Sequence, residues 1–201
     1  MSMYPHEIGK SYDALAESWQ TRPSPTNGIR QFERALRFVK TRGHALDIGC
    51  GSNPRLLDLI NKQGFQVEAI DISEKMITLA RQQRPQVTFH HADICTWTLP
   101  RQYDLISGWD SIWHVPLADQ EALMRKICDG LAPNGVFIFT NGGVDDPTEK
   151  TDDAMGVPVS FGAPGIPLLL EYLARFGCVC RHLEYDQYPE LHLVIIAQKR
   201  G

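Results

Sequence analysis

The chain has 201 residues, of which 43% are hydrophobic and 22% are charged, and its formal net charge is -4 at pH 7. This length suits one domain with a full apolar core, and the composition excludes a disordered chain. The acidic balance argues against a nucleic acid partner, because proteins that bind phosphate backbones usually carry an excess of Lys and Arg.

Strands and helices alternate along most of the chain. Residues 1–42 predict two helices, over residues 11–20 and 29–39, which we interpret as an N-terminal helical cap. From residue 43 on, short buried strands and amphipathic helices follow one another, which indicates an α/β domain (43–201) built on a parallel sheet. Strands are expected over residues 44–49, 65–71, 86–93, 103–109 and 136–141, and helices over residues 53–63, 74–83, 117–131 and 167–176.

Two later segments depart from this alternation. Residues 143–165 are rich in Gly, Pro and Asp and exceed the length of most connections, so they predict a loop with a function, such as a lid. Residues 178–186 and 190–199 flank a turn and predict a C-terminal β-hairpin.

A glycine turn joins the first strand of the α/β domain to a helix, in the segment LDIGCGSNP (46–54). Gly49 and Gly51 allow a sharp bend and a close approach of a ligand to the backbone. The third glycine of the dinucleotide-binding spacing is absent, and Asp47 ends the strand beside the turn. Because a carboxylate repels a pyrophosphate and attracts an ammonium or sulfonium, the turn predicts a site for a cationic ligand.

Two further acids, Asp71 and Asp93, end the next two strands, and the carboxyl ends of parallel strands lie on one rim of the sheet. Asp71 can accept hydrogen bonds from a ribose diol, or it can cap the following helix beside Ser73; the glycine turn in register favours the ribose. Asp93 can accept from an adenine amino group. Ile72 and Ile94, which follow the two acids, can contact the purine.

The segments LDIGCGSNP, AIDIS, HADI, YDLISGWDSIWHV and LAPNGVFIF follow one another between residues 46 and 139. In this order they resemble the motifs of class I S-adenosylmethionine-dependent methyltransferases, with Asn53 at the usual third glycine. The resemblance implies a Rossmann-like three-layer sandwich with helices on both faces. Its seven-stranded, mostly parallel sheet would have the order 3-2-1-4-5-7-6, with strand 7 antiparallel. Residues 43–201 would then bind S-adenosylmethionine and release S-adenosylhomocysteine.

The same resemblance implies which residues contact the cofactor. It assigns Asp47, Gly49 and Gly51 to the methionine part, Asp71 to the ribose, Ile72, Asp93 and Ile94 to the adenine, Ser107 and Gly108 to backbone contacts with the amino group, and Met76 to the same cofactor site.

The acceptor is expected at GWDSIWHVP (108–116), which follows the fourth strand. His114 titrates near neutral pH and is the candidate general base, and Asp110 is a candidate to orient His114 or the substrate. Trp109 and Trp113 are candidates to wall the acceptor pocket or to bind a cation through their ring faces. The alternative is a packed aromatic turn with a histidine at the surface.

Tyr12 and Trp19 are seven positions apart and share one face of the first predicted helix. Helices at this place commonly cover the cofactor in the family, so both are candidate substrate-binding residues on a lid. The alternative is ordinary packing.

The leading hypothesis is therefore transfer of a methyl group to a small molecule by in-line displacement. The alternatives are a methyltransferase acting on protein or RNA, a nicotinamide-dependent oxidoreductase and a non-catalytic nucleoside-binding module. The residues Gly108 to Ser111 replace the N-P-P-Y-like tetrad used for nitrogens of DNA, RNA and protein, which lowers the odds of such acceptors.

The cysteines and the apolar stretches bear on where the chain works. Five scattered cysteines favour a reducing compartment, and neither their spacing nor that of the histidines predicts a metal site. No stretch approaches the roughly 20 apolar residues of a membrane span, and the N-terminus does not resemble a secretory signal. We expect a cytoplasmic monomer or homodimer without membrane contact.

Overall fold

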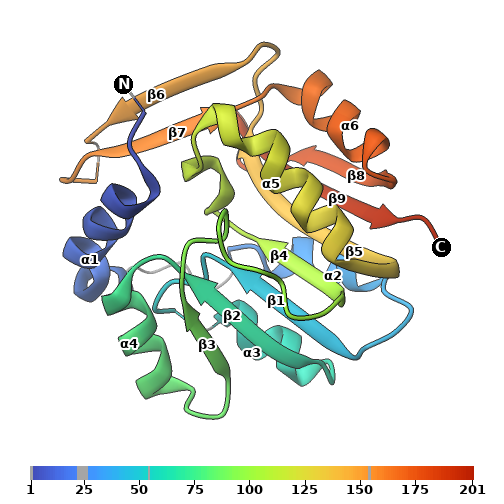
Figure 1. The fold of residues 1–201 in the computed structure, drawn as a ribbon, viewed down its shortest axis with the longest axis horizontal. Coiled ribbons are helices and arrows are strands. Elements are labelled where there is room, and N and C mark those ends of the chain that lie inside the picture. Colours follow the sequence, from blue (N-terminus) through green and yellow to red (C-terminus); the bar gives the residue numbers. More distant parts are fainter. Residues whose placement is uncertain (1, 22–26, 54, 154) are drawn as a thin grey trace.

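The computed structural model describes residues 2–21, 27–53, 55–153 and 155–201. Its centre is a seven-stranded sheet of order β3-β2-β1-β4-β5-β9-β8 (Figure 1). Within this sheet only β9 runs antiparallel to its neighbours, so the predicted order and the C-terminal hairpin are confirmed. The strands are β1 (His44–Ile48), β2 (Gln66–Asp71), β3 (Thr88–His91), β4 (Tyr103–Gly108), β5 (Leu131–Gly142), β8 (Cys178–Tyr185) and β9 (His192–Lys199).

Helices cover both faces of the sheet (Figure 1). Successive residues of β5 explain how two cores form: Val136 and Ile138 pack on the α2 and α3 side, whereas Phe137 and Phe139 pack on the α5 and α6 side. The α4 helix packs on β2 and β3. These helices are α2 (Ile29–Leu36), α3 (Arg55–Lys62), α4 (Glu74–Gln83), α5 (Leu117–Gly130) and α6 (Ile166–Arg175).

The first helix, α1 (Pro5–Thr21), begins well before the expected start at Ser11. Pro5 presets the helical φ at the first position, and the Tyr4 N–H donates to Glu7 Oε2 at 2.7 Å, which satisfies a free donor at the helix start. The helix contacts α4 and β7. The α2 helix instead packs against the sheet, and the proposed boundary between a cap (1–42) and the α/β domain (43–201) stays a prediction.

The prediction of a loop over residues 143–165 is wrong, because this segment contains a two-stranded antiparallel sheet, β6 (Thr148–Asp152) and β7 (Val159–Ala163). The β6 strand is polar and largely exposed, so it lacks the apolar alternation by which a strand is recognised. Its conformation comes from backbone pairing with β7, which in turn packs on the short helix η1 (Ile112–His114). The predicted lid function stays a prediction.

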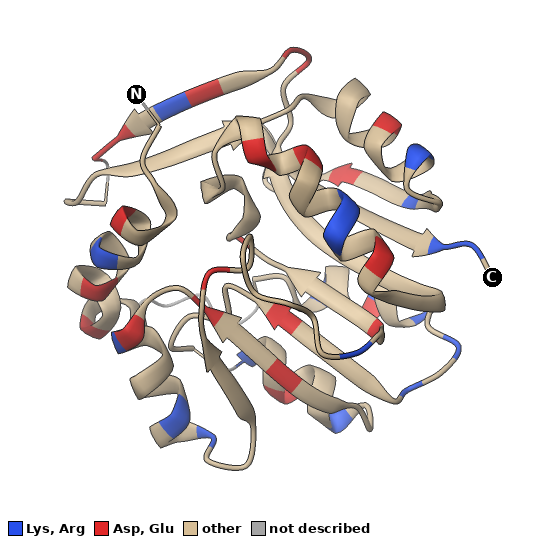
Figure 2. Cartoon of the chain, viewed as in Figure 1, with Lys and Arg blue, Asp and Glu red and all other residues tan. Residues whose placement is uncertain are grey.

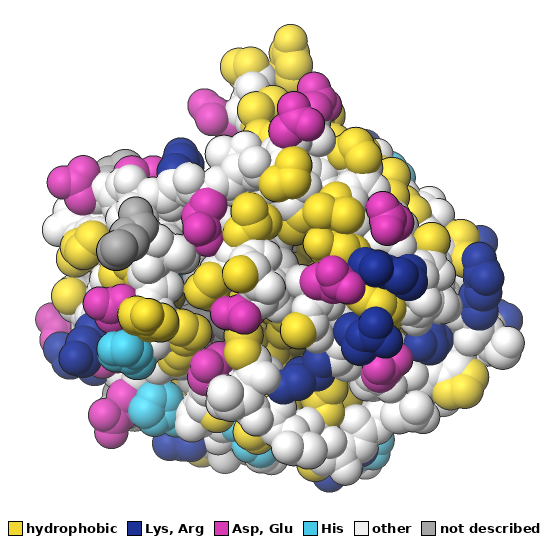
Figure 3. Space-filling view, turned by 45° about the horizontal axis from the view of Figure 1, so that its top comes forward, with side chains coloured by type: hydrophobic (Ala, Val, Ile, Leu, Met, Phe, Trp, Pro, Cys, Tyr) yellow, Lys and Arg dark blue, Asp and Glu magenta, His cyan; other side chains and the backbone are white. Residues whose placement is uncertain are grey.

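The described Lys and Arg side chains lie on helices, loops and strands (Figure 2). On the face drawn in Figure 3 most of them lie toward the right, next to acidic and hydrophobic side chains. Within the described ranges, none of the helices combines the length and the apolar character needed to traverse a bilayer. The same residues contain no group of three or more His, Cys, Asp or Glu side chains that could hold a metal ion.

Candidate active site

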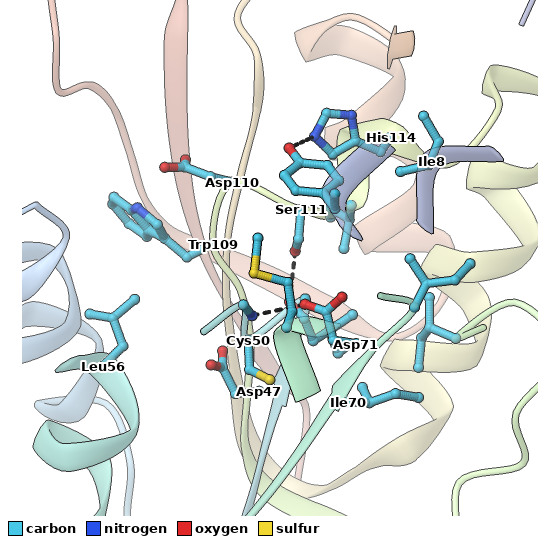
Figure 4. A pocket seen from close by; sticks show the side chains of 18 of the residues that line it. Ile8, Asp47, Cys50, Leu56, Ile70, Asp71, Trp109, Asp110, Ser111 and His114 are labelled. Carbon is cyan, nitrogen blue, oxygen red and sulfur yellow. Dashed lines mark hydrogen bonds between the residues drawn. The ribbon is translucent and has the colours of Figure 1, made fainter. Parts of the chain in front are cut away.

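A cavity of about 480 Å³ opens at the carboxyl ends of β1, β2 and β4, with residues of α1 on its wall (Figure 4). Its volume lies in the range of roughly 300–1,000 Å³ that is usual for small-molecule sites. The cavity brings together most of the residues expected from the sequence, namely Tyr12, Trp19, Asp47, Gly49, Gly51, Asp71, Ile72, Met76, Asp93, Ile94, Trp109, Asp110 and His114.

The glycine turn after β1 needs its glycines for two reasons. Gly49 and Gly51 have φ angles of 70° and 60°, in the left-handed region that favours glycine. A Cβ on Gly49 would lie only 2.2 Å from Ser111 Cβ. Ser111 itself is fixed, because its hydroxyl donates to the Ile48 carbonyl at 2.7 Å. The turn therefore passes under the segment that follows β4. Pro54, the last residue of the motif, lies outside the described residues.

Asp47, the last residue but one of β1, is a buried carboxylate on the cavity wall, 4% exposed. Burial raises the pKa of Asp47 to about 7; the hydrogen bond from Ser107 Oγ, 2.5 Å from Asp47 Oδ1, opposes this shift, and the charge of Asp71 adds to it. Ionisation of this buried carboxylate is therefore costly. A cationic ligand beside the carboxylate would remove that cost.

Asp71 ends β2 and is tied to two backbone donors. Its Oδ2 accepts from the Gly51 N–H at 2.8 Å and its Oδ1 from the Ser73 N–H at 2.9 Å. Burial nevertheless raises the pKa of Asp71, because these donors offset it only in part. Each carboxylate oxygen has a second lone pair, so contact with the start of α4 does not exclude acceptance from a diol in the cavity.

The segment after β3 forms the wall that includes Asp93 and Ile94. Asp93 Oδ1 accepts from the Cys95 N–H at 2.8 Å, which closes a tight turn. Lys126 on α5 holds the same segment from behind, because its ammonium donates to the carbonyls of Ile94, Cys95 and Trp97 at 3.0, 2.6 and 3.0 Å. The wall is thus fixed by charge-assisted hydrogen bonds.

His114 is a buried, fully hydrogen-bonded histidine, 8% exposed, so a surface histidine is ruled out. Its Nδ1 lies 2.8 Å from the Ser160 carbonyl and must carry the proton. Its Nε2 accepts from Trp113 Nε1 at 3.1 Å and lies 2.7 Å from the Tyr12 hydroxyl. Burial lowers the pKa of His114 to about 4. At pH 7 the ring is neutral and binds Tyr12 at the cavity wall (Figure 4).

Asp110 follows β4 with a φ of 52°, an uncommon angle for a residue other than glycine. Its N–H donates to Thr140 Oγ1 at 2.8 Å, and its Oδ1 lies 2.8 Å from His192 Nε2. Among the described residues, no hydrogen bond joins Asp110 to His114. The expected orientation of His114 by Asp110 is therefore corrected: Asp110 pairs with His192, and Ser160, Trp113 and Tyr12 fix His114.

Three expected residues lie outside the cavity wall: Ser107, Gly108 and Trp113. Ser107 acts on the site through Asp47, and Trp113 packs between His114, His192 and Phe161.

Sequence reasoning missed Arg55, which lines the cavity at the start of α3 and whose Nε donates to the Asn27 carbonyl at 3.1 Å. A cation in the first turn of a helix interacts unfavourably with the helix dipole. This unfavourable placement was the sequence feature that could have marked Arg55 as a functional residue. It also missed several other residues of the wall, namely Pro5, Ile8, Asn27, Ile48, Cys50, Asn53, Leu56, Ile70, Ala92, Ser111, Ile112 and Val115.

Known proteins resemble the chain in sequence and fold. A 28% identical relative, over 95 residues, is the dTDP-3-amino-3,6-dideoxy-alpha-D-glucopyranose N,N-dimethyltransferase of Streptomyces fradiae, with 46% of this chain and 37% of the relative covered. The trans-aconitate 2-methyltransferase of Variovorax paradoxus is 32% identical over 122 residues, with 59% and 46% covered. The chain spans less than half the length of either relative.

Among solved structures, S-adenosylmethionine-bound CalS10, an amino pentose methyltransferase from Micromonospora echinaspora, has the same fold, with a TM-score of 0.69. It is 16% identical, and the match covers 92% of this chain and 96% of that one. The family model described as a methyltransferase domain matches residues 24–184. Since this match includes β1 to β5, the glycine turn and the acids at the strand ends, the chain belongs to the methyltransferase domain family.

Proposed function

We propose that the chain transfers the methyl group of S-adenosylmethionine to a small-molecule acceptor by in-line displacement. The observation that carries this proposal is the pair of buried carboxylates, Asp47 and Asp71, whose pKa values are raised beside a glycine turn. Such a pair favours a ligand that brings positive charge into the cavity. The names of the relatives, which are methyltransferases of a sugar amine and of trans-aconitate, support the same reaction.

The residues of the cavity fit the parts of this cofactor. Asp47 would accept from the ammonium of the methionine part, with Gly49 and Gly51 against its chain, and Asp71 would accept from the ribose. Bound S-adenosylmethionine supplies a methyl group activated by its sulfonium. The adenine would lie against Ile72, Met76, Asp93 and Ile94, and backbone contacts from Ser107 and Gly108 to the amino group stay part of the proposal.

The protein's own part in the reaction is to align the acceptor and to exclude water. Neutral His114 holds the Tyr12 hydroxyl at the wall. Because its pKa of about 4 makes it a weak base, the expected general-base role of His114 would be a transient relay that passes a proton from Tyr12 on to solvent. Asp110 and Trp109 would form the acceptor side of the wall, and Tyr12 and Trp19 of α1 would contact the bound acceptor; all four line the cavity. Trp113 would support this side indirectly, through its hydrogen bond to His114.

Binding to the purified protein tests the proposal. In isothermal titration calorimetry, S-adenosylhomocysteine is expected to bind with a dissociation constant at least 100-fold below that of NAD, because Asp47 disfavours a pyrophosphate. Transfer of a labelled methyl group to members of a small-molecule panel should follow. Tighter binding of NAD, or no binding of S-adenosylhomocysteine, would refute the assignment.

Asp71→Asn is expected to weaken S-adenosylhomocysteine binding by roughly 1–3 kcal/mol, because one acceptor of the proposed ribose contact becomes a donor. Calorimetry measures the change. Asp104→Asn is the matched control: Asp104 Oδ2 also accepts two backbone N–H groups, from Gly43 and His44 at 2.9 and 3.1 Å, but it lies near the amino end of β4 and does not line the cavity. Equal affinity losses in both variants would show that Asp71 does not contact the ligand.

We further propose that the chain works in the cytoplasm as a monomer or homodimer, without a nucleic acid partner. Its net charge of -4 supports this. Light scattering during size-exclusion chromatography measures the oligomeric state.

A further inference from the structure

The side chains of Asp110, His192 and Asp186 form a hydrogen-bonded triad, with the Asp110 carboxylate at one end. His192, at the start of β9, has its Nε2 2.8 Å from Asp110 Oδ1 and its Nδ1 2.5 Å from Asp186 Oδ1. The side chains of His192 and Asp186 are 11% and 4% exposed, whereas that of Asp110 is 31% exposed and borders the cavity. Only the Asp110 end of the triad can therefore meet a ligand.

We propose that Asp110 binds an organic ammonium group of the acceptor, and that His192 and Asp186 are positioning residues that keep this carboxylate at the cavity wall. To accept the methyl group, the bound nitrogen would first lose a proton to the Asp110 carboxylate. Its lone pair would then form the N–C bond as the S–C bond breaks with its electrons on sulfur. The inference rests on the proposed function, whose acceptor class it names.

The two hydrogen bonds of His192 determine the net charge of Asp110, His192 and Asp186. A carboxylate only accepts, so each of the two His192 nitrogens must carry a proton to bond with Asp110 and Asp186. The imidazole is then a cation between two anions, and the three groups carry a net charge of -1. Burial lowers the pKa of His192, but the hydrogen bonds to the two carboxylates outweigh it and raise the value. His192 offsets one of the two carboxylate charges, and Asp110 is the carboxylate that borders the cavity, where it also interacts with the charge of Arg55.

The remaining charges of the cavity favour an amine over a carboxylic acid as acceptor. Among the described wall residues, the acids are Asp47, Asp71, Asp93 and Asp110, and Arg55 is the single Lys or Arg side chain. Asp110 lies beside Trp109 and apart from Asp47 and Asp71 in Figure 4, so the proposed cofactor contacts leave it available. A polycarboxylate would meet mainly negative charge there.

Two neighbours of Asp110 support this role: Trp109 can contact a bound cation, and Thr140 holds the Asp110 carboxylate in place. Trp109 lines the cavity next to Asp110, and its indole ring can add a cation–π contact. Thr140 binds Asp110 twice, since its hydroxyl accepts from the backbone N–H and lies 3.2 Å from Oδ1. The positive φ of Asp110 costs free energy, and such angles persist mainly where surrounding contacts enforce them, often at functional sites.

Matched ligands test the acceptor class on protein saturated with S-adenosylhomocysteine. Benzylamine and ethanolamine are compared with benzyl alcohol and ethylene glycol, and citrate serves as the polycarboxylate, all by NMR titration at pH 7. Each amine is expected to bind at least tenfold more tightly than its alcohol, and citrate more weakly than the amines. If each amine and its alcohol bind with equal affinity, or if protein that binds S-adenosylhomocysteine binds no amine, this inference is wrong while the proposed function stands. Failure of S-adenosylhomocysteine to bind overturns the proposed function.

Variants test the roles of the three residues. Asp110→Asn is expected to weaken amine binding about 10- to 100-fold, the range for a lost charge-assisted bond, with S-adenosylhomocysteine affinity changed less than twofold. His192→Leu should lose most amine affinity, and His192→Gln, which keeps a donor for Asp110, should regain part of it. Glu184→Gln is the control, since it makes the same charge change near Asp186 but faces Arg34 and His182.

A pH profile separates positioning from a merely structural effect. In the wild type the pKa of His192 is raised, so its loss of charge, and the change of amine affinity that follows it, should come at a higher pH than in Asp186→Asn. In Asp186→Asn the pKa of His192 should fall, since one carboxylate partner is gone, and amine affinity should rise with pH as the ring loses its charge. An unperturbed imidazole titration of His192 in the wild type, or flat amine binding in Asp186→Asn, contradicts the positioning role.

Discussion

At pH 8, Asp47→Asn is expected to raise the free energy of unfolding of the ligand-free protein by about 2–4 kcal/mol, and to weaken S-adenosylhomocysteine binding more than tenfold. Stability and binding should move in opposite directions because burial makes the Asp47 charge costly in the ligand-free protein, and the charge of Arg55 offsets this cost only in part. Asparagine keeps an oxygen that can accept from Ser107 Oγ, so the local hydrogen bond survives while the charge is removed.

The pH dependence of this effect follows from linkage. The pKa of Asp47 is about 7 in the folded protein, and roughly 4 is ordinary for an unfolded chain. The folded state therefore holds its proton more tightly. The associated stability is fully present below pH 4 and is lost as pH rises to 7. Urea denaturation at pH 4.5 and pH 8 measures it: wild type and Asp47→Asn should differ little at the lower pH and most at the higher one. A pH-independent difference would contradict the assignment.

Gly49→Ala is expected to destabilise the protein by at least about 3 kcal/mol, the largest effect of a single methyl group in this site. Two costs combine. The φ of 70° disfavours any side chain, and the new Cβ would lie 2.2 Å from Ser111 Cβ. Ser111 cannot easily withdraw, because its hydroxyl is bonded to the Ile48 carbonyl. Chemical denaturation measures the loss, and S-adenosylhomocysteine binding should fall with it.

Two controls separate these costs. Gly64→Ala has a similarly positive φ of 92° with nothing within 4 Å of the new Cβ, so it reports the backbone cost alone, about 1–2 kcal/mol. Combining Gly49→Ala with Ser111→Gly removes the colliding Cβ, and a double-mutant cycle with Ser111→Gly alone isolates the steric part. A Gly49→Ala loss no larger than that of Gly64→Ala would show that the turn yields.

The fold and the cofactor side of the site could be predicted from local sequence patterns. The acids Asp47, Asp71 and Asp93 lie at or just after the carboxyl ends of β1, β2 and β3, and parallel strands bring these ends to one rim, so their convergence could be predicted from spacing alone. The sheet order came from the family resemblance and is confirmed. The β6 strand could not be predicted, because its residues are polar and only its partner strand gives it structure.

The acceptor side depends on contacts between distant segments, which local patterns do not contain. His192 lies 82 residues after its partner Asp110, and the His114 ring bonds to Tyr12, 102 residues before it. Asp110 has a positive φ and pairs with His192 of β9, and no sequence rule assigns either feature to an aspartate with useful certainty. The residue types were predictable there, and their partners were not.

Two groups on the wall of one cavity exchange protons with solvent in opposite senses when the chain unfolds. Burial holds the pKa of His114 at about 4, so between pH 4 and 6.5 this ring takes up a proton on unfolding. Asp47, with its pKa of about 7, releases one over nearly the same interval. The two contributions are each about 3–4 kcal/mol across that interval and nearly cancel. The free energy of unfolding of the ligand-free protein should therefore change little on mild acidification, although each group by itself would change it.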